Sequence, residues 1–396
     1  MIWWLLLGAC SLLWAVGIGL GRSWDRKVAP LPRRAETSGA YRACVSVLIP
    51  ARNEESDLAS TLTALLAQSW TNLEIIVVDD HSTDATGRVA EEAAARDRRV
   101  RVLHHPELRP GWHGKPNALD HALGASSGEY VLMIDADVTL AADVIERAVA
   151  ALDQRGIEGL TLLDTICAGS WVEVTALPFK YLAAALVPPV FANDESTRFA
   201  FANGPFILVR RRVFERFSFE QIRRSIPVDV SMAAALLETG TRLYVLQAYG
   251  EVVRAQVYGG GVRGFVTGIA KNVTALLGGP KSSVYLGTLA ALLLAAFTWF
   301  PMGVLFAALY LGAPALAVGA ALAYAVPLVM SLFPGPAFRG RFGFLPLYPL
   351  SALLILTGQL TAAYFAIHRG SVRWRGRETL LHPSPLTDGR SSPPSI

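Results

Sequence analysis

Residues 128–137 read Gly-Glu-Tyr-Val-Leu-Met-Ile-Asp-Ala-Asp, an apolar run of strand length that ends in two carboxylates, Asp135 and Asp137. Strands that a parallel sheet buries on both faces are continuously apolar, and ligands bind where such strands end. In an extended segment alternate side chains share one face, so we expect Asp135 and Asp137 to point at the same ion or ligand. A divalent cation that prefers oxygen ligands would relieve the repulsion between the two carboxylates and hold a diphosphate.

The composition indicates a membrane protein with one sizeable globular domain. The chain has 396 residues, 52% of them hydrophobic, and a mean hydropathy of +0.38, which is too apolar for a protein that is soluble throughout. Its net charge of +4 suits a position beside anionic lipid, but the basic residues are not interleaved with aromatic ones, so we expect no nucleic-acid partner. Cys10, Cys44 and Cys167 show no metal-ligand spacing and are expected to be reduced.

Residues 1–21 are expected to form a transmembrane anchor, because they are apolar and carry no charge before Arg22. They lack a basic n-region and a cleavage site, which favours an uncleaved anchor over a signal peptide. Residues 22–43 are a basic linker in which Arg22, Arg26 and Lys27 follow the anchor directly. The positive-inside tendency then places the next domain in the cytosol.

Strand and helix patterns alternate from residue 45 onward. The strand-like segments are 45–49, 73–78, 100–103, 130–134 and 159–163, and the helix-periodic segments are 54–68, 86–96, 117–126 and 141–152. This alternation predicts an α/β domain with a mostly parallel sheet covered by helices. Ligands should therefore bind across the carboxyl ends of the strands.

Polar residues gather at those carboxyl ends. Residues 50–55 read Pro-Ala-Arg-Asn-Glu-Glu, residues 79–84 read Asp-Asp-His-Ser-Thr-Asp, and residues 111–115 read Gly-Trp-His-Gly-Lys. An alternative is that Asn53 or Asp84 only caps the next helix, and that Glu54 and Glu55 complement its dipole. Such loops at four successive strand ends favour a binding site.

In this order, the motifs at 45–55, 76–86, Gly114-Lys115 and Asp135-Ala136-Asp137 resemble glycosyltransferase family 2. The resemblance implies a GT-A fold and inverting transfer of a hexose from a nucleotide sugar, with a UDP-sugar as the expected donor. It also implies that Lys115 approaches the diphosphate and that Asp137, assisted by Asp135, holds Mg²⁺ or Mn²⁺. The donor-binding residues that it implies are Pro50, Ala51, Arg52, Asn53, Glu54, Asp79, Asp80, Lys115, Asp135 and Asp137.

The resemblance also implies a catalytic base at Asp229. Family 2 proteins usually carry an acidic pair before a helix about a hundred residues beyond the Asp-x-Asp motif, and the second member is the base. The matching segment, 226–232, reads Ile-Pro-Val-Asp-Val-Ser-Met, so Val228 stands where the usual Glu would be. The alternative for Asp229 is the N-cap of an alanine-rich helix.

Three further positions are candidates for acceptor or supporting contacts. Residues 202–211 resemble the family strand before the base, where a small-residue turn faces the sugar, so Asn203 is a candidate for an acceptor or sugar contact. Arg254 and Lys271 are candidates for phosphate or lipid contacts, or they are simple membrane anchors. Residues 171–193 either lie at the membrane surface beside the acceptor site or form an internal helix packed on the sheet.

The remaining sequence is largely membrane-forming. Residues 44–255 are assigned to the cytosolic GT-A domain, 256–283 to an interfacial segment, 284–368 to about three spans, and 369–396 to a basic and then disordered tail. Four spans in total make this a multi-pass cell-membrane protein. However, basic residues lie both before and after the last span, so either one hydrophobic segment is re-entrant or the tail breaks the positive-inside tendency.

Three functional hypotheses follow. The leading one is single-sugar transfer to a lipid-soluble acceptor, because membrane spans that flank the catalytic domain suit a substrate dissolved in the bilayer. Residues 112–115, residues 254–258 and Lys271-Asn272 also look similar to those of bacterial glycosyltransferases linked to carotenoid and hopanoid pathways, which implies an isoprenoid-type lipid. The second is a processive polysaccharide synthase, which the missing Gln-x-x-Arg-Trp motif opposes. The third is a non-catalytic membrane scaffold that binds nucleotide sugars.

Overall fold

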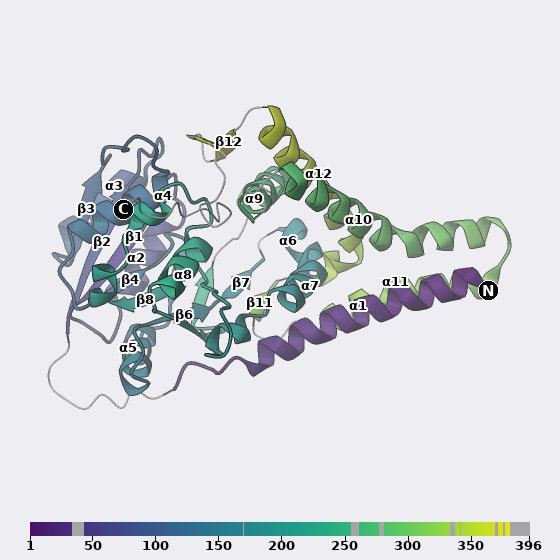
Figure 1. The fold of residues 1–396 in the computed structure, drawn as a ribbon, viewed down its shortest axis with the longest axis horizontal. Helices are drawn as coiled ribbons and strands as arrows, with labels where there is room; N and C mark the ends of the chain where they lie inside the picture. Colours follow the sequence, from purple (N-terminus) through teal and green to yellow (C-terminus); the bar gives the residue numbers. More distant parts are fainter. Residues whose placement is uncertain are drawn as a thin grey trace, which may run out of the picture.

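An α/β domain with three long apolar helices extending from it makes up this computed structural model (Figure 1). The helices are α1 (Ile2–Lys27), α10 (Lys281–Tyr310) and α11 (Pro314–Ser331). The structure describes residues 1–33, 43–168, 170–254, 261–276, 281–332, 337–340, 342–368, 371–374 and 377–380.

A seven-stranded sheet in the order β3-β2-β1-β4-β8-β6-β9 forms the centre of the domain. Its strands are β1 (Val45–Ala51), β2 (Leu73–Asp79), β3 (Val100–His104), β4 (Tyr130–Met133), β6 (Gly159–Leu163), β8 (Ile207–Arg210) and β9 (Leu243–Gln247). Only β8 runs antiparallel to its neighbours in this sheet. The predicted mostly parallel α/β sheet is therefore confirmed.

Helices cover both faces of the sheet. They are α2 (Leu58–Leu66), α3 (Thr86–Arg96), α4 (Gly114–Gly124), α5 (Val144–Gln154) and α8 (Val228–Glu238), with the short η2 (Arg211–Glu215) and η3 (Phe219–Ile222). Alternate residues of β1 enter two apolar cores: Val47 and Ile49 pack with α2 and α5, and Leu48 packs with α4 and α8. The continuously apolar strands reflect this burial on both faces.

Several element boundaries differ from the prediction, and three of them bear on the site. The helix expected at 54–68 begins at Leu58, because residues 53–55 bond to the loop before α3. The helix expected at 117–126 begins at Gly114, since Pro116 is tolerated in a first helical turn. The fourth strand ends at Met133, so Asp135 and Asp137 lie in a loop and turn, and the expected extended geometry for this pair is wrong.

A second sheet ties the membrane-side segments to the domain. It contains β5 (Val138–Leu140), β7 (Thr165–Cys167), β10 (Val252–Arg254) and β11 (Phe338–Arg339) in the order β11-β7-β10-β5. Since β11 follows α11 in the chain and pairs with β7, the segment between α11 and the last long helix lies against the domain.

The end of α1 is also fixed to the domain. The helix continues to Lys27 rather than ending near residue 21. Beyond it Pro30 pairs with Gln247 of β9, and Leu31 N–H donates to the Gln247 carbonyl over 2.7 Å. The first residues of the predicted linker are therefore part of the folded domain.

Residues 171–193 form α6 (Trp171–Thr175), α7 (Leu177–Leu186) and η1 (Pro189–Asn193). α7 packs along the second half of α1, where Gly21 lets the Tyr181 backbone approach closely. The packing on the sheet that was one of the two alternatives therefore holds only for η1, where Asn193 Nδ2 donates to the Val245 carbonyl of β9 over 2.8 Å. Leu186 and Val187 at the end of α7 are 82% and 50% exposed.

In the described part of the chain, four helices are long and apolar enough to cross a membrane, as predicted: α1, α10, α11 and a stretch that combines η5 (Phe342–Leu347) with α12 (Tyr348–His368). α12 runs antiparallel beside α10, where Trp299 Nε1 donates to the Pro349 carbonyl over 2.9 Å and Gln359 Nε2 lies 3.4 Å from Thr288 Oγ1. It ends on the domain side, beside α9 (Gly261–Leu276) (Figure 1).

The chain after α12 forms a hairpin of β12 (Ser371–Trp374) and β13 (Arg377–Leu380), where no secondary structure was predicted. The hairpin lies against α9 and α12. The tail at 381–396, predicted to be disordered, lies outside the described residues.

Candidate active site

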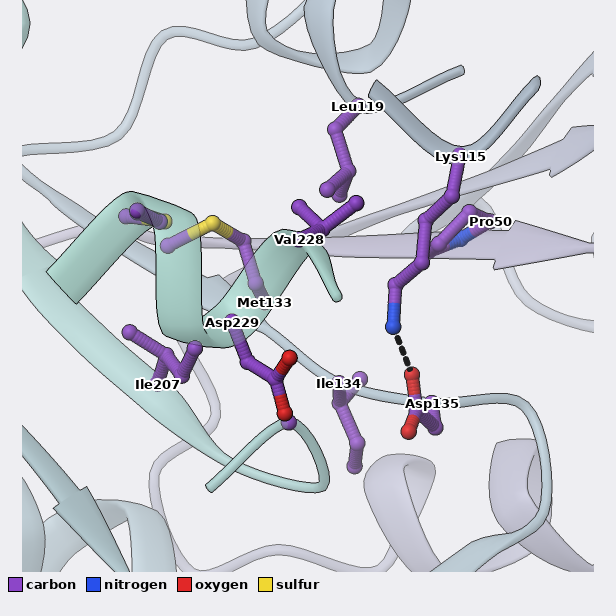
Figure 2. A pocket seen from close by; sticks show the side chains of 11 residues that line it. Pro50, Lys115, Leu119, Met133, Ile134, Asp135, Ile207, Val228 and Asp229 are labelled. Atoms are coloured by element: carbon purple, nitrogen blue, oxygen red, sulfur yellow. Dashed lines mark hydrogen bonds and ion pairs between the residues drawn. The ribbon is translucent and has the colours of Figure 1, made fainter. Parts of the chain in front are cut away.

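A pocket lies at the carboxyl ends of β1 and β4, beneath the start of α8 (Figure 2). It is lined by Pro50, Lys115, Leu119, Met133, Ile134, Asp135, Gly204, Ile207, Val228, Asp229 and Met232. Its open volume is about 280 Å³. This volume includes space that is open to solvent.

Lys115 and Asp135 form an ion pair at this pocket. The Nζ atom of Lys115, in the first turn of α4, donates to Asp135 Oδ1 over 2.6 Å. Burial works to lower the pKa of the Lys115 ammonium, but the charges of Asp135, Asp229 and Asp137 outweigh burial, so the pKa is raised. Lys115 therefore stays charged at neutral pH and offers a fixed positive charge to an anionic ligand.

Asp229 faces the same pocket from the first turn of α8. Pro227 occupies the cap position of this helix and Asp229 is its second residue, so the N-cap alternative for Asp229 is wrong. Gly204 separates Asp229 from Asp135: a Cβ atom built on Gly204 would lie 3.1 Å from Asp229 Oδ2 and 3.5 Å from Asp135 Oδ2. The two carboxylates thus flank one small opening that a glycine keeps clear.

Val228, which replaces the usual Glu of the family, belongs to the apolar wall of the pocket. It is 4% exposed and packs in one cluster with Leu119 and Met133 (Figure 2). A carboxylate at this position would lose its hydration without gaining a partner in this cluster.

Asp135 and Asp137 fit a hard divalent cation. Asp137 follows Asp135 in the short turn between β4 and β5, and both side chains are of intermediate exposure. Carboxylate oxygens are the ligands that Mg²⁺ and Mn²⁺ prefer. The donor set of this loop therefore suits the predicted ion.

The loops after β1 and β2 are fastened to each other by polar bonds. Arg52 Nη1 donates to the Asp80 carbonyl over 2.6 Å, and Asn53 Oδ1 accepts from Thr83 N–H over 2.8 Å. Asp84 Oδ1 accepts from Thr86 N–H at the start of α3, but the cap residue of that helix is Ala85. The cap residue of α2 is Asp57, so neither Asp84 nor Asn53 occupies a cap position. Asp79 and Asp80 are buried at the end of β2 and Ala51 is buried in β1, whereas Pro50 lines the pocket.

Among the lower-ranked candidates, Asn203 is held by the end of β6. Its Nδ2 donates to the Leu162 carbonyl over 2.7 Å and to Asp164 Oδ1 over 2.9 Å. These bonds position the turn that carries Gly204. The side chains of Arg254 and Lys271 lie outside the described part of the chain.

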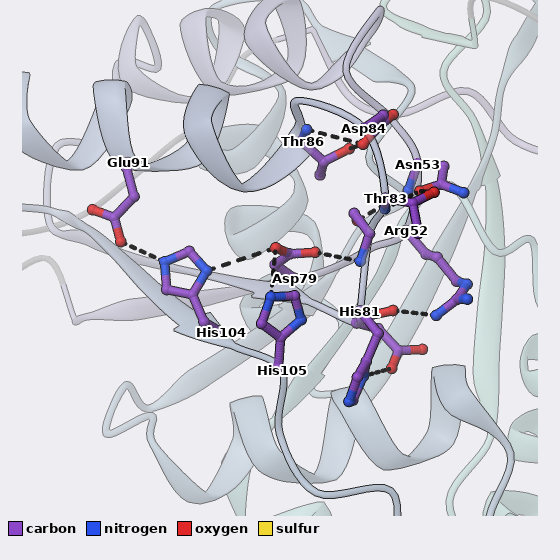
Figure 3. A network of polar contacts seen from close by, with 12 residues as sticks. Arg52, Asn53, Asp79, His81, Thr83, Asp84, Thr86, Glu91, His104 and His105 are labelled. Carbon is purple, nitrogen blue, oxygen red and sulfur yellow. Dashed lines mark hydrogen bonds and ion pairs between the residues drawn. The ribbon is translucent and has the colours of Figure 1, made fainter.

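Sequence reasoning missed two histidines. His104 ends β3 opposite Asp79 in the strand register, and His105 follows it. Together with Asp79 they form a compact cluster of potential metal ligands (Figure 3). The available signal was a His-His pair at the carboxyl end of the third predicted strand.

Residues 46–222 match the family model described as Glycosyl transferase family 2. This segment, which makes up less than half of the chain, is similar to family 2 glycosyltransferases. The domain that contains it has a GT-A-like fold: the chain superposes with a TM-score of 0.51 on the mannosyltransferase PcManGT from Pyrobaculum calidifontis, solved with GDP-Man and Mn²⁺. That pair is 20% identical, and the alignment covers 88% of this chain and 98% of that one.

Two curated relatives resemble part of the chain over about a hundred residues each. Glycosyltransferase GlyG of Streptococcus pneumoniae is 33% identical over 102 residues, which cover 26% of this chain and 33% of that protein. Beta-monoglucosyldiacylglycerol synthase of Nostoc sp. is 33% identical over 124 residues, which cover 31% of this chain and 26% of that protein. The chain thus matches no more than about a third of the length of these relatives.

Proposed function

We propose that the protein is an inverting hexosyltransferase that moves one sugar from a nucleotide-diphosphate sugar, with a UDP-sugar as the expected donor, to a lipid-soluble acceptor. The observation that carries this proposal is the convergence of Lys115, Asp135 and Asp229 on one pocket of a domain similar to family 2 glycosyltransferases. An ammonium group for a diphosphate and a carboxylate for an incoming hydroxyl are the two groups that sugar transfer requires.

In this mechanism Asp229 is the general base. It accepts the proton of the acceptor hydroxyl while the hydroxyl oxygen forms a bond to the anomeric carbon of the donor sugar. The bond from that carbon to the diphosphate breaks, and its electron pair leaves with the nucleoside diphosphate. Lys115 stabilises the charge that develops on the leaving group, and Asp135 positions Lys115 and keeps it charged.

The donor would lie along the carboxyl edge of the sheet. We assign the nucleoside end to the fastened loops after β1 and β2, with Pro50, Ala51, Arg52, Asn53, Glu54, Asp79 and Asp80. Asp137 and Asp135 would hold Mg²⁺ or Mn²⁺, which supplies charge neutralisation at the leaving diphosphate when bound. The Mn²⁺ and GDP-Man bound by the Pyrobaculum mannosyltransferase support this assignment.

A membrane-dissolved acceptor accounts for the helices that flank the domain. Exposed large apolar side chains are concentrated on α1, α10, α11 and α12, as lipid-facing helices require. Exposed Leu186 and Val187 extend this apolar surface onto α7 at the domain boundary. The name of the Nostoc relative, a monoglucosyldiacylglycerol synthase, supports a lipid acceptor.

We further propose that α1, α10 and α11 cross the membrane and that the segment 342–368 enters and leaves it on the domain side. β11, which precedes this segment, pairs with β7 of the domain, and the hairpin that follows it lies against α9. This arrangement keeps the basic residues on both sides of α12 in the cytosol with the domain, as the positive-inside tendency requires. It is the re-entrant alternative, with three crossings.

Accessibility of cysteines added singly to a cysteine-free variant tests this topology. A cysteine at Gly312 should react from the side opposite the domain, and a cysteine after Ile396 should react from the domain side. Labelling of the C-terminal cysteine from the opposite side would mean that α12 crosses the membrane.

The activity is tested by nucleoside diphosphate release from detergent-purified protein. UDP- and GDP-sugars are offered with diacylglycerol or polyisoprenyl lipids, and the product is analysed by mass spectrometry. We expect release that requires lipid and adds one sugar, and that falls at least ~10²-fold in Asp229→Asn while donor affinity is retained. Longer products would favour the processive alternative, and donor binding without release would favour the scaffold.

A further inference from the structure

A second group of potential ligands lies where β2 and β3 end, away from the Asp135–Asp137 loop. The Nδ1 atom of His104 lies 3.6 Å from Asp79 Oδ2, and Nε2 of His105 lies 3.9 Å from the same oxygen (Figure 3). The ligand atoms of the three residues all lie within 4.8 Å of one another. Both imidazoles thus converge on one carboxylate oxygen.

The surrounding bonds orient these groups as ligands. Nε2 of His104 lies 2.5 Å from Glu91 Oε1, and because a carboxylate only accepts, the nitrogen is the donor. A neutral His104 then presents the lone pair of Nδ1 to Asp79. The other Asp79 oxygen, Oδ1, accepts from Ser82 N–H over 3.0 Å, which fixes the carboxylate. A carboxylate behind a histidine is the usual support of a metal-bound imidazole.

The backbone of His105 has an unfavourable conformation in this cluster. Three non-glycine residues of the described chain have positive φ: Asn53, His81 and His105, each just beyond the end of β1, β2 or β3. His105 has a φ of 44°, and its ring lies 5.2 Å from that of His81. Such strain persists where the surroundings impose it, commonly at functional sites.

We propose that Asp79, His104 and His105 form a binding site for one borderline divalent transition-metal ion, Zn²⁺ above all. Two imidazoles and one carboxylate suit Zn²⁺ better than Mg²⁺ or Mn²⁺, which prefer all-oxygen sites. Zinc bonds of about 2.0–2.2 Å require ligand atoms roughly 3.3 Å apart, so the two imidazoles must move closer to Asp79 and to each other to complete the set. The side chains of His104 and His105 are 40% and 52% exposed, which gives the ion access and leaves a position for water.

This site differs from the Asp135 and Asp137 pair in position and in ligand type, but it shares Asp79 with the proposed nucleoside end of the donor site. Zn²⁺ binding can be measured without turnover, so failure of this proposal and failure of the proposed transferase reaction are distinguishable. A metal here would join the ends of two neighbouring strands and neutralise a carboxylate that is 3% exposed.

Calorimetric titration of Zn²⁺ into chelator-treated, tag-free full-length protein in detergent tests the proposal. We expect one ion per chain, and at least ~10-fold weaker binding in His104→Ala and in His105→Ala. Glu91→Gln, which removes no ligand, should weaken binding by about 10–100-fold. The Co²⁺ form should show the absorption of nitrogen-ligated Co²⁺, and His105→Ala should lose it.

Control variants show whether a loss of Zn²⁺ binding is specific to the proposed ligands. Asp137→Ala and His121→Ala, which alter the donor loop and a histidine of α4 outside the cluster, should bind Zn²⁺ as the parent protein does. His105 is half-exposed, so its alanine variant should unfold at the parent temperature without metal. Absence of Zn²⁺ binding, loss of binding in Asp137→Ala, or unchanged binding in both His105→Ala and Glu91→Gln would overturn the proposal.

Discussion

The two ends of the central sheet treat partly buried carboxylates differently. Where the parallel strands begin, Glu74 accepts hydrogen bonds from the Ser46 hydroxyl and from the N–H groups of Ser127 and Gly128. Burial opposes the charge of Glu74, but these donors outweigh burial and lower its pKa. Where the strands end, Asp135 and Asp229 face a pocket in which Lys115 supplies the positive charge.

This contrast separates a stabilising end from a functional end. At the first, the protein satisfies each acceptor with its own backbone and hydroxyl groups, so no ligand is needed. At the second, the carboxylates and the ammonium group border open space, and their interactions can be completed by a ligand. Substitutions at the two ends should therefore affect different measurements.

The largest effect is expected for Lys115→Met. It removes the charge proposed to stabilise the leaving diphosphate, so turnover should fall by about 10²–10³-fold. The melting temperature should change little, because the Lys115 side chain is 40% exposed. Lys27→Met, at the end of α1, is the control and should retain activity. Full turnover in Lys115→Met would remove this lysine from the mechanism.

At the opposite end, Gly128→Ala should reduce stability rather than catalysis. A Cβ atom on Gly128 would lie 2.7 Å from both the Cys44 carbonyl and the Ser46 backbone nitrogen. Overpacking of this kind costs about 1–3 kcal/mol of unfolding free energy, measurable by thermal or denaturant unfolding. Gly124→Ala, where no atom beyond the adjoining residues and the helix's own backbone lies within 4 Å of the new Cβ, should not lower stability.

The complementary substitution at the functional end is Gly204→Ala. The new Cβ would crowd Asp229 Oδ2 at 3.1 Å, and the carboxylates can move aside, so the fold should persist. Displacement of the proposed base should lower turnover by about 10-fold or more, with little change in melting temperature. If Gly204→Ala lowered the melting temperature as much as Gly128→Ala does, the stabilising end and the functional end of the sheet would not differ in their effect on stability.

Much of this contrast could be predicted from sequence, because strand order and strand ends follow from local patterns. The alternation of apolar strands and periodic helices located β1 to β4, and the polar loops after them contain Lys115 and Asp135. The convergence of Asp229 on the same pocket was implied only by family resemblance. Its distance from Asp135 depends on β8 and the turn at Gly204, which local periodicity does not specify.

What the sequence did not reveal depends on register and on neighbours distant in the chain. The parallel register that sets Asp79 opposite His104 joins positions 25 residues apart, and neither histidine has metal-ligand spacing by itself. The pairing of β11 with β7 likewise brings a loop between hydrophobic segments onto the domain. Hydropathy counts such segments but does not show whether each one crosses the membrane.

The smallest expected effect tests the stabilising end by pH. Asp97, just before β3, accepts hydrogen bonds from the Arg99 side chain and N–H, which lower its pKa from 3.8 to about 2. Because the folded pKa lies below the unfolded one, the stabilisation is complete above about pH 4 and is lost as the pH falls toward 2.

Asp97→Asn should therefore lower the unfolding free energy at pH 7, by less than about 1 kcal/mol because the pair is partly exposed to solvent. The difference from the parent protein should shrink between pH 4 and pH 2. Arg99→Gln should cause a similar loss, and the double variant should lose no more than either single one if the two residues act only through each other. Transferase turnover at pH 7 should be unaffected in all three. A pH-independent difference would mean that the Asp97 carboxylate is not the stabilising group.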